Sequence, residues 1–134
     1  LNAIGSFNVN GNKKLSQQIG RSELSRETYF VGKNICHTIF FDKQRYLQCK
    51  PHNEASILFC ELMKLLLDQQ DGKLFHDPVA AFLLKNPMHG LWKYGYPIYT
   101  SNSWTTILQN TSDTQILIDI NYDAFWESIT NFTI

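Results

Sequence analysis

Apolar residues at three- and four-residue spacing mark a long helix in the middle of the chain. The periodic stretch covers residues 51–71, carries an acidic residue in its first turn and is followed by Gly72, a common helix terminator. Its repeating apolar positions are Ala55, Leu58, Phe59, Leu62, Leu65 and Leu66. Because Ile57, Met63 and Leu67 widen this stripe, we expect a buried helix that belongs to the core rather than to a partner-binding groove.

A second, shorter helix is predicted to begin at Asp77-Pro78 and to run to about residue 85. Asp is a favoured N-cap residue, and Pro is common at the first helical position because its missing N–H costs nothing there. The apolar face of this helix consists of Val79, Phe82 and Leu83. We expect Asp77 to be an ionised N-cap, stabilised by backbone N–H groups and the helix dipole, and His76 to end the extended segment before it.

Three runs rich in β-branched and aromatic residues follow this helix and predict strands. They cover residues 96–100, 104–108 and 114–120 and are separated by Ser, Asn and Asp turns, so we expect a short antiparallel meander. A final helix is predicted over residues 122–129, with Phe125 and Ile129 one turn apart on its apolar face.

The first part of the chain has weaker patterns. Residues 5–12 are dense in Gly and Asn and predict a loop, and residues 13–19 predict a short helix closed by Gly20. Residues 28–31 and 35–41 predict one or two short strands. This order of helices and strands indicates an α/β fold.

Composition and charge narrow the class of protein. The 134 residues are 43% hydrophobic and 13% aromatic, which suits one packed domain over residues 1–134. Twelve basic residues balance twelve acidic ones, so the chain lacks the positive field that nucleic acid or an anionic membrane requires. No apolar run approaches the roughly 18 residues of a membrane span. We therefore expect neither nucleic acid nor a membrane as a partner.

The cysteines bear on the cellular compartment, and the start of the chain bears on whether the domain is complete. Cys36, Cys49 and Cys60 are odd in number and lack C-x-x-C spacing, which argues against a zinc site or a dense disulfide framework and favours a reducing, cytoplasmic compartment. Because the chain opens without Met and within what reads as domain sequence, we expect a C-terminal fragment of a longer domain as the alternative to a single complete domain.

The candidate chemistry lies at His76 and Asp77, where an imidazole that can carry a proton at neutral pH adjoins an anionic oxygen ligand. Helix capping beside a partly buried histidine is the structural alternative for this pair. Trp92, Trp104 and Trp126 are interpreted as core and rim aromatics rather than as a platform for stacking a base.

Several motifs in order resemble one known family. They are F-V-G-K-N-I-C-H at residues 30–37, the long helix, G-K-L-F-H-D-P-V-A-A at residues 72–81, then Trp104 and the run to Phe125-Trp126. This order resembles the C-terminal part of the inosine-uridine nucleoside hydrolases, in particular the subgroup with K-N-x-C-H and K-x-F-H-D-P. The resemblance extends along most of residues 5–129.

The resemblance implies an α/β fold with a mostly parallel sheet, and hydrolysis of a nucleoside to ribose and free base with a tightly held Ca²⁺. It implies that Asp77 ligates calcium, that His76 is catalytic and interacts with the leaving base, and that Asn8 in the Phe7-Asn8 pair holds a ribose hydroxyl. His37 and Asn34, within the K-N-x-C-H motif, are further candidates to line the site.

The chain also departs from the family. Ser6 stands where many members have Glu, and no D-x-D-x-x-x-D-D pattern supplies the N-terminal aspartates of the calcium site. Asp68 and Asp71 are interpreted as solvated residues at the end of the long helix. On its own, therefore, the chain is expected to be an incomplete hydrolase site.

Three hypotheses remain: part of a nucleoside hydrolase, an inactive binding or scaffold module of the same ancestry, and an unrelated α+β interaction domain. For the first, the expected partners are a nucleoside substrate and either a second copy of the chain or an N-terminal half.

Overall fold

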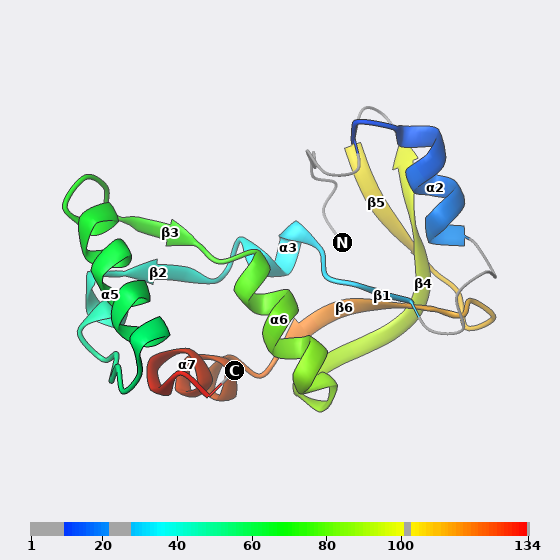
Figure 1. Cartoon of the computed structure of the whole chain (residues 1–134). Coiled ribbons are helices and arrows are strands. Elements are labelled where there is room, and N and C mark those ends of the chain that lie inside the picture. The colour runs from blue at the N-terminus through cyan, green and yellow to red at the C-terminus, as the bar shows by residue number, and fades with distance from the viewer. Residues whose placement is uncertain (1–9, 22–27, 101–102, 134) are drawn as a thin grey trace. The chain divides into compact units, whose positions relative to one another are not determined.

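The structure, a computed structural model, describes residues 10–21, 28–100 and 103–133. Helices and strands are mixed, as predicted (Figure 1). The chain divides into two compact units, each made of two separate segments: the first unit is residues 1–35 and 90–119, and the second is residues 36–89 and 120–134. Among the described residues, no helix is both long enough and apolar enough to cross a membrane.

The first unit is built on a four-stranded sheet. Its elements are α2 (Lys13–Arg21), β1 (Thr28–Phe30), β4 (Gly90–Thr100), β5 (Ser103–Leu108) and β6 (Thr114–Ile120). The strand order is β1-β6-β4-β5, with β1 parallel to β6 and β4 antiparallel to β5. The three predicted strands exist, but the predicted simple meander is wrong, because β6 lies between β1 and β4 instead of beside β5.

Side-chain burial explains this strand order. Ile116 and Leu117 are adjacent in β6, and both are buried, so this strand is covered on both faces, as a central strand is. Ile107 and Leu108 at the end of β5 are exposed, which fits an edge strand. Gly95 of β4 faces β5 so closely that a Cβ atom there would collide with the carbonyl oxygen of Ile107.

Helix α2 packs against β4 in the same unit. The ammonium group of Lys13 lies 4.2 Å from the centroid of the Tyr99 ring, and Gln17 Nε2 donates to the Tyr99 carbonyl at 3.5 Å. The helix continues through Gly20 to Arg21, so the prediction that Gly20 ends it is wrong. Most of the predicted loop at residues 5–12 lies outside the described residues.

The second unit combines a two-stranded ladder with helices. Its elements are β2 (Phe40–Asp42), α4 (Lys43–Tyr46), α5 (Glu54–Leu67), β3 (Gly72–Leu74), α6 (Asp77–Lys85), the 3-10 helix η1 (Pro87–His89) and α7 (Tyr122–Asn131). Helix α3 (Lys33–Cys36) lies where the chain passes from the first unit to the second. The predicted strand at residues 35–41 is therefore mostly helix and turn, because Ile35 and Ile39 make short-range backbone hydrogen bonds to Gly32 and Cys36.

The core of the second unit is aromatic. Phe41 of β2, Phe82 of α6 and Phe125 of α7 are fully buried or nearly so. The rings of Phe82 and Phe125 meet edge to face at 5.5 Å, and Phe41 stacks on Phe75 at 4.8 Å. The Phe41 ring also lies 6.4 Å from the ring of Trp126 in α7, so α6, α7 and the β2–β3 ladder share this core.

Helix α5 forms as predicted but is not buried as predicted. Asn53 caps it through a reciprocal pair of hydrogen bonds with Ser56, a capping box. Its buried residues are Ser56, Cys60 and Met63, all on one side. Leu58, Leu62 and Leu65 on the opposite side are 55%, 57% and 60% exposed. The expectation of a helix buried on several sides is wrong for the described chain, because the second unit covers one side of α5 only.

Candidate functional site

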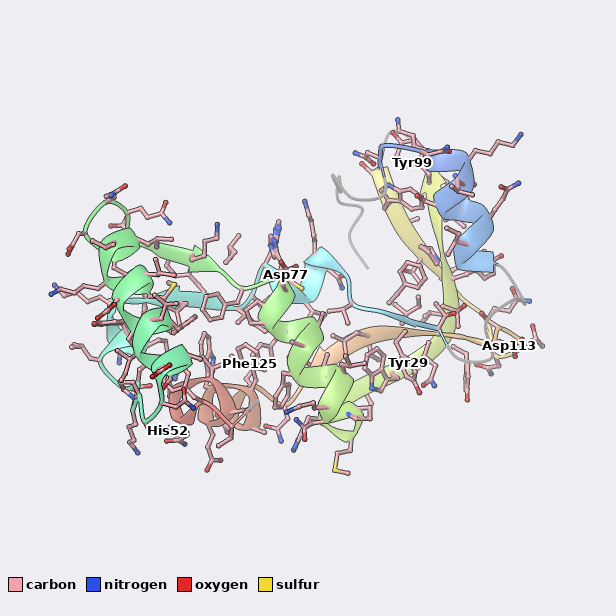
Figure 2. All side chains as sticks on the ribbon, viewed as in Figure 1. Tyr29, His52, Asp77, Tyr99, Asp113 and Phe125 are labelled. Carbon is pink, nitrogen blue, oxygen red and sulfur yellow. The ribbon has the colours of Figure 1, made fainter. Side chains whose placement is uncertain are left out.

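The candidate site is centred on the junction between β3 and α6. His76 is the residue before the helix and already has helical backbone angles, φ −91° and ψ −64°. Asp77 is therefore the first residue inside α6 rather than its N-cap, and the N-cap residue His76 makes no capping hydrogen bond with its side chain. Pro78 lies in the first turn, as predicted. The exposed Asp77 carboxylate remains at the positive end of the helix dipole, where Figure 2 labels it.

The β2–β3 ladder brings a second histidine to this junction. Phe40 is opposite Leu74 in the ladder. Ile39 and Phe75 form the next pair in the same register, because the Phe75 N–H donates to the Ile39 carbonyl at 2.9 Å. Further along the same direction, the rings of His37 and His76 stack with centroids 5.2 Å apart and an angle of 23° between their planes. Antiparallel pairing thus unites two histidines that are distant in the sequence.

The two imidazoles differ in exposure. His37 is exposed, whereas His76 is half-buried and its Nε2 atom is shielded from solvent. The His37 ring is therefore accessible from the surface, and the His76 ring lies at the edge of the core. An imidazole can donate or accept a proton, which is the chemical capacity of this pair.

Cys36 is a third member of the cluster that was not singled out from the sequence. Its thiol donates to the His76 carbonyl at 3.9 Å, a weak contact that joins the end of α3 to the residue before α6. Burial raises the pKa of Cys36 to about 11, and the nearby Asp77 carboxylate adds to this rise. Cys36 is thus a neutral thiol near physiological pH. The signal that marks it is its place in the K-N-x-C-H motif, next to His37.

One further polar contact lies next to the two histidines in the sequence. The hydroxyl groups of Thr38 and Tyr122 lie 2.8 Å apart, so the residue after His37 contacts the start of α7. Within the described part of the chain, no group of three or more His, Cys, Asp or Glu side chains is arranged to hold a metal ion. Asp77 is then one carboxylate, whereas calcium takes six to eight oxygen ligands. The described residues do not complete a calcium site.

The other two predicted site residues are Asn34 and Asn8. Asn34 is half-buried in α3 and belongs to the first unit. Asn8 lies outside the described residues, as do Ser6 and Phe7. Trp104 and Trp126 are buried, and Trp92 meets Tyr29 edge to face at 5.0 Å; these surroundings fit the interpretation of the tryptophans as core and rim aromatics.

Comparison with known proteins gives one distant relative. No protein-family model matches the chain. An uncharacterized protein of Aquifex aeolicus is 30% identical over 95 residues, a match that covers 67% of this chain and 32% of that protein. The chain thus spans about a third of the length of the relative that it matches.

Proposed function

We propose that this chain supplies the C-terminal part of the site of a ribonucleoside hydrolase, an enzyme that cleaves the bond between base and ribose. The observation that carries the proposal is the stacked pair of His37 and His76 beside Asp77, at the residues where the K-N-x-C-H and K-x-F-H-D-P motifs resemble those of nucleoside hydrolases. The nucleoside-hydrolase-like fold is part of the same proposal, in which this chain supplies a portion that pairs β1 with β6 in parallel and β4 with β5 antiparallel.

In the proposed reaction, His76 is the catalytic residue. Loss of a base from ribose passes through an oxocarbenium-like state, and the departing base gains negative charge that a proton neutralises. His76, half-buried at the rim of the core, is assigned as the donor of that proton. His37 stacks against His76 and is proposed to line the same side of the site.

Asp77 is assigned to the metal. When bound, a calcium ion in such a site orients the attacking water and the ribose hydroxyls. Because the described residues contain no group of three or more potential metal ligands, the proposal places the other ligands on a further polypeptide segment, an N-terminal half or a second copy of the chain. The match covers 32% of the Aquifex relative, so that protein has further chain outside the match. Asn8 is proposed to bind the ribose.

The alternative function is an inactive binding or scaffold module of the same ancestry. The absent aspartate pattern and Ser6 at the position of the family's Glu favour it. The two functions differ in one measurable property, since only the enzyme releases free base from a nucleoside.

Complementation tests the proposal. The chain is assayed with inosine and with uridine in the presence of calcium, alone and mixed with the part of the Aquifex protein that lies outside the match. We expect turnover in the mixture. We further expect His76→Ala to lower kcat by about 10²- to 10⁴-fold, the range typical of a lost general acid. Asp77→Ala is expected to abolish the dependence of turnover on added calcium.

His52→Ala and Asp71→Ala are the matched controls, because both residues are exposed and lie outside the cluster. Both control variants are expected to keep full turnover. If the mixture releases no base, or if His76→Ala leaves kcat unchanged, the hydrolase proposal is refuted and the scaffold function replaces it.

A further inference from the structure

The exposed side of α5 carries a continuous apolar row. Its members are Ala55, Leu58, Leu62 and Leu65, all exposed, and the three leucines keep 55%, 57% and 60% of their surface. Their spacing of three, four and three residues places them on one stripe of the helix, as at the a and d positions of a coiled coil. The buried residues of α5 fall at other positions of this heptad pattern, so the packing of the second unit leaves the apolar row uncovered.

Acidic side chains follow one edge of the apolar row. Glu54, Glu61 and Asp68 are exposed and recur at every seventh residue, so all three occupy the g position of the same heptad pattern. Lys64, the basic residue of α5, falls at position c, on the side away from the leucines. This acidic edge therefore presents carboxylates to whatever lies along the row.

The other edge of the row joins the aromatic core. Phe59 and Leu66, at the e positions, are half-buried. The Phe59 ring meets the rings of Phe41 and Phe75 edge to face, with centroids 5.8 Å and 6.3 Å away. These contacts fix which side of α5 faces outward. A helix lying on the row therefore meets apolar side chains along one edge and carboxylates along the other.

The charge pattern decides which kind of helix fits the row. If the α5 helices of two copies paired antiparallel, the acidic edge of one would face the acidic edge of the other. If they paired in parallel, the carboxylates would face apolar e positions and lose water without gaining an opposite charge. A helix with basic residues along the matching edge instead pairs with each carboxylate, so charge complementarity favours a basic partner.

We propose that the apolar row of α5 is the docking site for an amphipathic helix of a partner protein. That helix has apolar residues at heptad spacing, and it has lysine or arginine along the edge that meets Glu54, Glu61 and Asp68. The leucines supply the apolar contact area, and the carboxylates set the orientation and selectivity of docking. This interaction uses no residue of the candidate site, so it is independent of the proposed hydrolase function.

Two fluorescently labelled model peptides test the proposal. Both carry leucine at the a and d positions of about three heptads, and they differ in having either lysine or glutamate at the other positions. Fluorescence anisotropy with the whole chain should show tighter binding of the lysine peptide, by about tenfold or more. This preference should shrink at high salt, because salt screens charges at the surface. Equal binding of the two peptides overturns the proposal.

Leucine substitutions show whether the peptide binds at the row. Leu62→Ser combined with Leu65→Ser should weaken binding of the lysine peptide by about tenfold or more. The circular dichroism spectrum should stay unchanged, because both side chains are exposed. Leu84→Ser, which changes an 86% exposed leucine of α6, is the matched control and should bind like the wild-type chain. Unchanged binding by the double variant, or equal weakening by the control, overturns the proposal.

Charge reversal tests the acidic edge separately. Glu61→Lys combined with Asp68→Lys should reverse the preference, so that the glutamate peptide binds more tightly than the lysine peptide. The control is Asp123→Lys combined with Glu127→Lys, which changes the net charge equally at exposed positions of α7. This control should keep the wild-type preference. If both pairs reverse the preference, or if neither does, the acidic edge does not select the partner and the proposal is overturned.

Sedimentation velocity of the chain alone tests the competing occupant, a second copy. We expect the sedimentation of the wild-type chain and of the Leu62→Ser/Leu65→Ser variant to show the same dependence on concentration. Self-association of the wild-type chain that this variant abolishes would show that a second copy covers the row, and would overturn the proposal.

Discussion

Cys36 shows how one residue couples the packing of this protein to its candidate chemistry. The side chain is 3% exposed, and its thiol contacts the backbone of His76. Asp77 lies near enough to oppose formation of a Cys36 thiolate. A buried thiol in this position behaves as a small apolar group with a weak donor, so its protonated form is the form that the folded protein accommodates.

This preference predicts a loss of stability in alkali. The folded-state pKa of Cys36, about 11, is above the ordinary value of 9.0, so between these values the folded chain binds more protons at this site than the unfolded chain does. The contribution is fully present below about pH 9 and is lost as the pH rises to about 11. We expect a loss of about 1–3 kcal/mol in the free energy of unfolding.

Urea unfolding from about pH 8 to about pH 11 measures this effect. Other groups titrate in that range, so the comparison is made between a chain lacking Cys49 and Cys60 and the same chain with Cys36→Ala added. The added substitution should flatten the fall in stability. Equal slopes in the two chains would show that Cys36 does not ionise with the raised pKa.

At the residue scale, the sequence identifies His76, Asp77 and His37 as candidates but does not predict their contacts. His76 and Asp77 were identified by their place before a predicted helix, which is local information. The contact of His37 with His76 depends on the register of the β2–β3 ladder, and the contact of Cys36 depends on where α3 ends. Neither follows from spacing along the chain.

At the scale of elements, α5 shows that the formation of a helix and the burial of its apolar side chains have different causes. Its apolar residues at helical spacing and its capping box produce a helix irrespective of what surrounds it. Which side is buried depends on the neighbours, and the second unit packs only against the side of Cys60 and Met63. An apolar helix surface is therefore not in itself evidence of a core position.

Paired substitutions on α5 test this assignment. Met63→Ala removes a side chain that is 8% exposed, and we expect it to cost about 2–5 kcal/mol of stability. Leu62→Ala changes the neighbouring residue, which is 57% exposed, and should alter stability by no more than about 0.5 kcal/mol. Denaturant unfolding of both variants is the measurement. A cost for Leu62→Ala equal to that for Met63→Ala would show that the outer side of α5 is packed.

At the scale of the whole molecule, neither unit is a continuous piece of chain. The second unit takes residues 36–89 from one segment and residues 120–134 from another. The second segment contributes Phe125, Trp126 and Ile129, all buried. Its helix α7 also accepts the hydrogen bond from Lys50, so the second unit needs both segments for its core.

Substitution within α7 tests this dependence. Phe125 is fully buried and packs on Phe82, so Phe125→Ala should lower the free energy of unfolding by about 3–5 kcal/mol (Figure 2). Glu127→Ala, at an exposed position of the same helix, should change it by no more than about 0.5 kcal/mol. The measurement is denaturant unfolding followed by far-UV circular dichroism. A small effect of Phe125→Ala would mean that the second unit is stable without the α7 core.

The sequence by itself determined the elements that depend on neighbouring residues: α5 from its periodicity and cap, α6 from Asp77-Pro78, and β4, β5, β6 and α7 from their apolar patterns. Only the tertiary structure decided the strand order β1-β6-β4-β5, the exposed side of α5, and the contacts of His76 with His37 and with Cys36. The physical reason is the distance along the chain over which the two kinds of interaction act. Helix periodicity and capping act over a few residues, whereas strand order and side-chain contacts are selected by packing between segments far apart in the chain.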